Sequence, residues 1–167
     1  IINAGGRLGN SKYGVDLLSS DNYEIIKDRA IKLIKLNNKR KKIEQNILKD
    51  IDFEKINSEN KDVIIYYRND INEGLIGIIA SRLKDYFNKP SIVITNSNNN
   101  LKASARSTSS YNIGYLIKSL IDNNIIDRGG GHNMAAGFIM KKNNLKYLDN
   151  FIQNDYSKKL LKFQNIN

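Results

Sequence analysis

The stretch from Asp127 to Phe138 carries the residues best suited to hold an anion. It reads Asp-Arg-Gly-Gly-Gly-His-Asn-Met-Ala-Ala-Gly-Phe and contains the only histidine of the chain. Met134, Ala135 and Ala136 are good helix formers, so we expect a helix to begin near His132. A glycine-rich turn that leads into a helix presents free N–H groups and the positive end of the helix dipole to a phosphate. A tight strand-to-helix turn with a structural histidine is the alternative interpretation.

A second candidate for anion binding is the segment Lys102–Ser107, which reads Lys-Ala-Ser-Ala-Arg-Ser. In a strand, its small residues alternate with Lys102, Ser104 and Arg106, which then share one face. Arginine offers a planar fork that suits phosphate oxygens, and serine offers a short hydroxyl donor. An ordinary exposed strand face is the alternative. Arg82, on the helix expected before this strand, is either a further basic contact or a salt-bridged structural residue.

The chain lacks the residues of a self-sufficient catalytic centre. It has no cysteine, which excludes disulfides and thiolate metal sites, and its single histidine excludes a histidine-rich metal site. The sequence contains no G-x-S-x-G nucleophile elbow. Asp70 and Glu73 lie close together in the sequence, but carboxylates beside a turn are usually exposed. We therefore expect this chain to bind an anion, to hold no metal ligands and to perform no chemistry alone.

Charge and composition point to the class of partner. The 167 residues carry a formal net charge of +10, which favours a polyanion, with nucleic acid first and an anionic membrane second. An AT-rich coding bias, visible in the many Lys, Asn and Ile residues, is the alternative cause. The basic run Lys39–Lys42 is interpreted as a solvated helix face. No stretch of about 18 apolar residues exists, so we expect no membrane span.

The beginning of the sequence has neither a starting methionine nor the basic-then-apolar layout of a signal peptide. We therefore expect a fragment or an excised domain. The absence of cysteine fits a reducing compartment, and we expect a cytoplasmic location.

Hydrophobic periodicity predicts an α/β fold in which a long connecting helix precedes a mixed β-sheet of about four or five strands with flanking helices. Residues 1–11 are predicted to be rich in turns, residues 51–61 to form a loop, and residues 96–100 to form a turn. The helix expected over residues 22–50 is either continuous or broken near Asn37–Asn38. The expected helices are 12–19, 22–50, 74–87, 112–122 and 144–163, and the expected strands are 63–67, 91–95, 101–107 and 138–140.

Four segments in this order resemble the RecJ family of single-stranded-DNA-specific exonucleases, within the DHH phosphoesterase superfamily. They are Ile2–Leu8, Gly74–Leu83, Lys102–Ser107 and Gly130–Gly137. The resemblance covers nearly the whole chain, and four motifs in register are far more specific than one. The chain departs from the family where Ile71-Asn72 stands in place of Trp-His before the Gly74–Leu83 motif.

The resemblance implies a two-lobed core, of which this chain holds the later part. Residues 1–20 would be the tail end of the DHH catalytic lobe, residues 21–50 the interdomain helix, and residues 51–167 the DHH-associated domain that binds substrate. The first lobe would carry the ligands of Mn²⁺ or Mg²⁺, upstream of this chain, and an OB-fold would lie downstream.

The resemblance also implies roles for individual residues. Contacts to substrate phosphate or sugar would come from Ser104, Arg106 and the loop Gly130–His132, with His132 in a supporting catalytic role. Asn3 and Arg7 would face the cleft. We add Arg82 and Ser107 to the predicted nucleic-acid contacts; the full set is Asn3, Arg7, Arg82, Ser104, Arg106, Ser107, Gly130, Gly131 and His132.

The function expected from these observations is the nucleic-acid-binding half of a 5′-to-3′ single-stranded DNA exonuclease. Its reaction would be metal-dependent phosphodiester hydrolysis in DNA recombination and repair. The expected partners are single-stranded DNA and repair proteins such as a single-strand-binding protein or a helicase. One alternative is a DHH-family oligoribonuclease or cyclic-dinucleotide phosphodiesterase. Another is a non-catalytic nucleic-acid-binding module.

Overall fold

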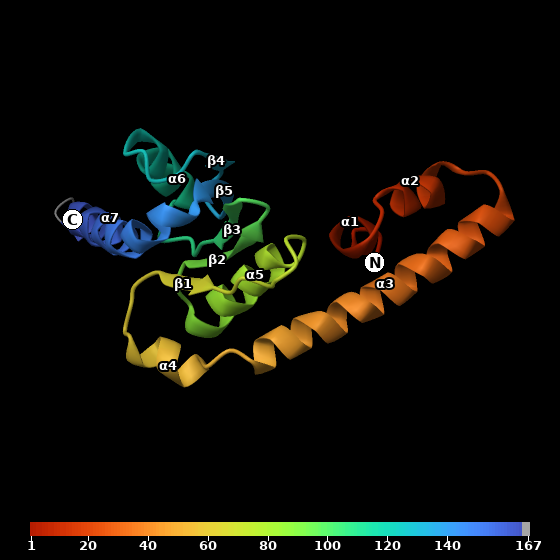
Figure 1. Cartoon of the computed structure of the whole chain (residues 1–167), viewed down its shortest axis with the longest axis horizontal. Helices are drawn as coiled ribbons and strands as arrows, with labels where there is room; N and C mark the ends of the chain where they lie inside the picture. Colours follow the sequence, from red (N-terminus) through yellow and green to blue (C-terminus); the bar gives the residue numbers. More distant parts are fainter. Residues whose placement is uncertain (165–167) are drawn as a thin grey trace. The chain divides into compact units, whose positions relative to one another are not determined.

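The computed structural model describes the backbone of residues 1–164 and the side chains of residues 1–158 (Figure 1). Two compact units are present: unit 1 comprises residues 1–51 and 72–75, and unit 2 comprises residues 52–71 and the chain from Ile76 onward. No helix within the described residues is long and apolar enough to cross a bilayer. The elements in order are α1 (Ala4–Leu8), α2 (Lys12–Ser19), α3 (Tyr23–Lys49), α4 (Phe53–Ser58), β1 (Ile64–Tyr67), α5 (Ile76–Phe87), β2 (Ser91–Ser97), β3 (Asn100–Arg106), α6 (Ile113–Asp122), β4 (Arg128–Gly131), β5 (Ala135–Lys141), the 3₁₀ turn η1 (Lys142–Asn144) and α7 (Leu145–Gln164).

Unit 1 is built on the long helix α3, against which α1 and α2 pack. The Asn22 side chain caps α3 by accepting hydrogen bonds from the amides of Glu24 and Ile25. The helix is continuous over 27 residues, so the break considered near Asn37–Asn38 does not occur. The prediction of turns alone over residues 1–11 is wrong, because α1 forms there. Its residues Ala4 and Gly5 are buried, which gives this short helix the packing that its sequence alone cannot supply.

Unit 2 contains a five-stranded sheet in the order β1-β2-β3-β5-β4. β1 pairs with β2 in parallel, and all other pairs are antiparallel, which confirms the predicted mixed sheet. β2 and β3 form a hairpin in which Ser97 pairs with Asn100. Asn98 in this turn has a φ of 52°, a left-handed conformation that asparagine adopts more readily than most residues.

Helices cover the two faces of this sheet unequally (Figure 1). On one face, α6 and α7 bury a continuous core against β2, β3 and β5, in which Leu120 and Ile152 meet Ile94, Ala103 and Phe138. On the other face, α5 packs on β2 and β3. The buried side of α5 is formed by Ile76, Ile79, Ala80 and Leu83.

A short helix replaces part of the loop that was predicted over residues 51–61. The Asp52 side chain caps α4 by accepting from the amide of Lys55 at 2.9 Å. The Phe53 ring lies 4.5 Å from the ring of Tyr86 and 5.8 Å from that of Phe87 on α5. The prediction missed α4 because a polar six-residue segment has no clear periodicity, and its order comes from the cap and these aromatic contacts.

The helix predicted to begin near His132 is wrong. Residues 128–131 and 135–141 form the β4–β5 hairpin, in which the amide of His132 donates to the carbonyl of Ala135 at 2.9 Å. β5 alternates in burial, with Ala136, Phe138 and Met140 directed into the core. Because this period of two buries apolar area, it outweighs the helix propensity of the Met-Ala-Ala run.

The loop after β3 is tied to the last helix through Tyr111. Its hydroxyl donates to Oδ2 of Asp155 on α7 at 2.8 Å, and its ring lies 4.8 Å from that of Tyr156. Burial, together with the Asp155 carboxylate, raises the pKa of Tyr111 above its ordinary value of 10.0. The folded chain therefore holds this proton more tightly than the unfolded chain, so the resulting stability is complete below about pH 10 and falls as the pH rises further.

We expect Tyr111→Phe to lower the free energy of unfolding at pH 7 by about 1.5–3 kcal/mol, because a buried hydrogen bond to a charged group is lost. Above pH 10, the unfolding free energy of the variant should fall less steeply than that of the unsubstituted chain. Urea unfolding at several pH values checks both effects. If the unfolding free energies of the two proteins fell in parallel above pH 10, Tyr111 would not be the source of this pH dependence.

Candidate nucleic-acid interface

The sheet face that carries α5 also presents β5, β4 and the part of β3 that this helix leaves uncovered. Paired residues of antiparallel strands lie side by side on the same face, so the register arranges this surface in three rows. We call it the open face. Its first row is Lys102, Ile139 and Arg128, its second is Ser104, Gly137 and Gly130, and its third is Arg106 and Ala135, with His132 following in the hairpin turn.

Lys102, Arg128, Arg106 and His132 lie at the corners of the open face, and the small residues Ser104, Gly137 and Gly130 form its middle row. A Cβ added at Gly130 would meet no atom within 4 Å, and one at Gly137 would meet only the Ala103 carbonyl oxygen, at 3.4 Å. Arg128 and His132 are exposed, whereas Lys102, Ser104 and Arg106 are half-buried. The floor of the face is therefore backbone with room above it, which allows a ligand to approach closely.

Ser104 and Arg106 are joined by a hydrogen bond on the open face. Nη1 of Arg106 donates to Oγ of Ser104 at 3.2 Å and to the Ala105 carbonyl at 2.8 Å. Within the part of the chain whose side chains are described, no carboxylate forms an ion pair with Arg106. A cation held by neutral acceptors is suited to bind an anionic ligand, because no internal anion competes for it.

Gly77 of α5 closes one side of this pair. A Cβ at Gly77 would lie 3.1 Å from both Nη2 of Arg106 and Oγ of Ser104. The glycine therefore lets the helix lie against the two polar side chains and limits the directions in which the guanidinium can turn.

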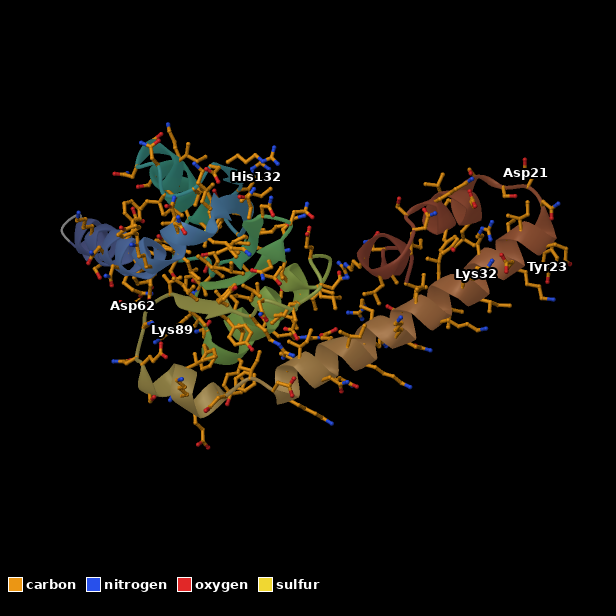
Figure 2. The ribbon with its side chains drawn as sticks, in the orientation of Figure 1. Asp21, Tyr23, Lys32, Asp62, Lys89 and His132 are labelled. Atoms are coloured by element: carbon orange, nitrogen blue, oxygen red, sulfur yellow. The ribbon has the colours of Figure 1, made fainter. Side chains whose placement is uncertain are left out.

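The hairpin turn that carries His132 is fixed from the side of α6. Nδ2 of Asn112 donates to Oδ1 of Asn133 at 2.7 Å, and the amide of Ile113 donates to the Asn133 carbonyl at 3.1 Å. The amides of Gly114 and Tyr115 donate to Oδ1 of Asn112. The first amides of α6 are therefore engaged within the protein. The anion site expected at the N-terminus of a helix near His132 does not form, because residues 135–141 are a strand. Figure 2 shows His132 beside β4 and β5.

The remaining predicted site residues lie elsewhere. Ser107 is 1% exposed, and its hydroxyl donates to the Tyr111 carbonyl at 2.5 Å, so this hydroxyl is not presented to solvent. Arg82 is exposed on α5. Asn3 and Arg7 belong to unit 1, where Asn3 is the exposed N-cap residue of α1 and Arg7 is half-buried.

Arg128 and Gly137 of the open face, and Gly77 of α5 beside it, were absent from the predicted site. The sequence places Arg128 directly before the three glycines, which is a usable signal for a cation beside the glycine floor. Gly137 becomes part of the site only through its pairing with Ser104 and Gly130. Residues 91–148 contain seven Lys or Arg and two Asp or Glu, so the region that builds the open face is strongly basic.

The described side chains do not form a site that fits a divalent metal. No group of three or more His, Asp or Glu side chains lies together within residues 1–158. Asp50 and Asp52 are two residues apart in the sequence, but Asp50 ends α3 and Asp52 caps α4. Hard divalent cations need several oxygen ligands around one point, so we derive no metal-dependent step from this chain.

Comparison with known proteins finds similarity over most of the chain. A model of the DHHA1 domain matches residues 60–158. The single-stranded-DNA-specific exonuclease RecJ of Haemophilus influenzae is 33% identical over 149 residues, which cover 84% of this chain and 26% of that protein. The chain therefore spans about a quarter of the length of the curated relative.

Two solved structures have a similar fold. The structure of RecJ in complex with Mn²⁺ from Thermus thermophilus has a TM-score of 0.82 at 23% identity and covers 94% of this chain and 23% of that one. A pGpG-specific phosphodiesterase from Vibrio cholerae has a TM-score of 0.55 at 12% identity, covering 94% of this chain and 55% of that one.

Proposed function

Because the chain belongs to the DHHA1 domain family and is homologous to part of RecJ, we propose that it forms the nucleic-acid-binding half of a single-stranded DNA exonuclease. The open face is the surface that binds the strand. The observation that carries this proposal is the Arg106–Ser104 pair beside a floor of glycine. Arg106 has no carboxylate partner among the described side chains, and the space above Gly130 is empty of protein atoms.

The proposed role of the open face is to hold and orient a phosphate. Arg106 supplies several N–H donors in a fixed plane, and the hydroxyl of Ser104 lies beside them. His132 lies at the end of the same face and would donate a hydrogen bond to the phosphate or help to neutralise its charge. Asn3, Arg7 and Arg82 remain proposed contacts of the same substrate.

The hydrolytic step itself is assigned to residues outside this chain. In the proposed enzyme, Mn²⁺ or Mg²⁺ would activate water and neutralise charge on the phosphate. The side chains described here position the strand for that step. We further propose 5′-to-3′ polarity, a cytoplasmic role in recombination and repair, and partners such as a single-strand-binding protein or a helicase.

We expect the 167-residue chain to bind a fluorescent oligothymidylate and to leave it uncut when manganese is added. Affinity should fall as salt rises, with a slope of about −0.7 in log–log form for each phosphate neutralised. Fluorescence anisotropy and a gel assay of the same samples check both statements. Cleavage of the strand, or affinity that does not change with salt, would contradict the proposal.

A cyclic-dinucleotide phosphodiesterase or oligoribonuclease is the alternative within the superfamily. The pGpG-specific phosphodiesterase has a similar fold, so the fold alone does not separate the two functions. Competition separates the two functions. An excess of a linear dinucleotide such as pGpG displaces a long thymidylate strand poorly if the chain belongs to a RecJ-type enzyme. A non-catalytic module would bind the strand equally well and differs in lacking Asp and His metal motifs elsewhere in its reading frame.

A further inference from the structure

A second group of cations lies on the open face, at the end away from His132. Lys102 on β3 and Arg128 on β4 both pair with Ile139 of the strand between them. Together with Gly129 and Gly137 they line a cavity of about 390 Å³. We call Lys102, Ile139 and Arg128 the distal row.

The composition of the distal row favours one kind of ligand. Long cationic side chains can keep their stems on apolar surface, and Lys102 and Arg128 flank Ile139 on the two neighbouring strands. Ile139 is half-buried and has no polar group. Asp127, the nearest acid in the sequence to Arg128, lies directly before β4 and is exposed. The row therefore presents two positive charges around an apolar centre.

The distal row lies one nucleotide's length from the proposed phosphate site at Arg106 and Ser104. Lys102 lies two residues before Ser104 on β3, and Arg128 lies two residues before Gly130 on β4. Two residues of a strand span about 7 Å. The sugar–phosphate backbone of one nucleotide covers such a separation, so neighbouring phosphates of one strand can occupy the two rows.

We propose that the distal row is a second phosphate subsite, in which Lys102 and Arg128 hold the phosphate next to the one at Arg106 and Ser104. The sugar of the intervening nucleotide lies on Ile139 and the glycine floor. This inference rests on the proposed function, because it extends the path of the same single strand across β3, β5 and β4. It assigns a role to Lys102 and Arg128, for which the motif resemblance specified none.

The test is a binding cycle with the 167-residue chain and oligothymidylates in which one phosphate at a time is replaced by a neutral methylphosphonate. We expect Lys102→Gln/Arg128→Gln to weaken binding of the fully charged strand about tenfold. At one position, the methylphosphonate should weaken binding by the unsubstituted chain but not by the double variant. At a neighbouring position, the methylphosphonate should weaken binding by the unsubstituted chain but not by the Arg106→Gln variant. Such non-additivity identifies direct contact between the two altered groups.

Lys118→Gln/Lys146→Gln is the matched control. It removes the same charge from exposed positions on α6 and α7, the helices that cover the opposite face of the sheet. The control should bind with nearly unchanged affinity and retain every methylphosphonate effect. If the distal-row variant and the methylphosphonate act additively at all positions, the subsite is wrong although the proposed function stands. If Arg106→Gln also changes nothing, the proposed function fails as well.

Discussion

Reversing the charge of Arg106 is expected to weaken single-strand binding about a hundredfold. The variant Arg106→Glu loses hydrogen bonds between charged groups, each worth about 1.5–3 kcal/mol, and adds a repulsion between the new carboxylate and the phosphate. The salt dependence should become shallower by about 0.7 in log–log slope for the lost phosphate contact. Anisotropy titrations at several salt concentrations measure the affinity and the slope together.

Two further variants separate the geometry of Arg106 from its charge. Arg106→Lys keeps one positive charge but lacks the planar fork, so we expect an affinity between those of the unsubstituted chain and the reversed variant. Lys118→Glu makes the same change in net charge on the far side of the sheet and should bind within about twofold of the unsubstituted chain, because exposed charges beyond a Debye length are screened. Equal losses for Lys118→Glu and Arg106→Glu would mean that only net charge attracts the strand.

The sequence predicted the sheet well where burial imposes a strict period. β2 carries an apolar run, and β3 alternates small buried residues with Lys102, Ser104 and Arg106. The structure confirms this alternation, because Ala103 and Ala105 enter the core and the three polar residues share the other face. A period of two determines which side chains share a face even when the neighbouring strands are unknown.

The hairpin at His132 could not be predicted from propensity. β4 consists of Arg128 and three glycines, which have low strand propensity, and its order depends on pairing with β5. Met134, Ala135 and Ala136 favour a helix when taken alone. The decisive information is the burial of Ala136 and Phe138 against α6, a contact between segments separated in sequence.

In the candidate site too, the sequence predicted the residue types but not the contacts between distant segments. The residue types that bind phosphate were visible in the sequence, and the structure brings Ser104 next to Arg106. The way in which the glycines contribute was not visible. They serve as the floor of a sheet, because they form β4 and pair with the following strand β5, where a helix was expected. Ser107 looks equivalent to Ser104 in sequence, but it lies just after the end of β3 and is buried, where its hydroxyl donates to the Tyr111 carbonyl.

The three glycines of β4 should therefore respond differently to substitution. Among the described residues, no glycine has a positive φ, so alanine causes no backbone strain and its effect reports packing. A Cβ at Gly131 would overlap the Cβ and Cα atoms of Ala136, and one at Gly129 would lie 2.8 Å from Cβ of Phe138 and 2.9 Å from Cγ2 of Ile117. A Cβ at Gly130 would enter open space.

We expect Gly131→Ala to lower the free energy of unfolding by about 3 kcal/mol, because the overlapping atoms belong to the backbone and first side-chain carbon of the neighbouring strand and cannot move aside alone. Gly130→Ala should change stability by no more than about 0.5 kcal/mol. Urea unfolding followed by circular dichroism gives both values. A similar loss of stability in the two variants would show that the glycines act through strand propensity and not through packing.

Binding by the Gly130→Ala chain then separates the floor of the open face from the fold. Its added methyl group lies in the row of Ser104 and Gly137, where the proposed strand approaches the backbone. We expect this stable variant to bind oligothymidylate less tightly than the unsubstituted chain. Because Gly130 contributes no side chain, such a loss can come only from occupied space, and it would locate the bound strand directly above the glycine floor. Unchanged affinity would place the strand elsewhere on the protein.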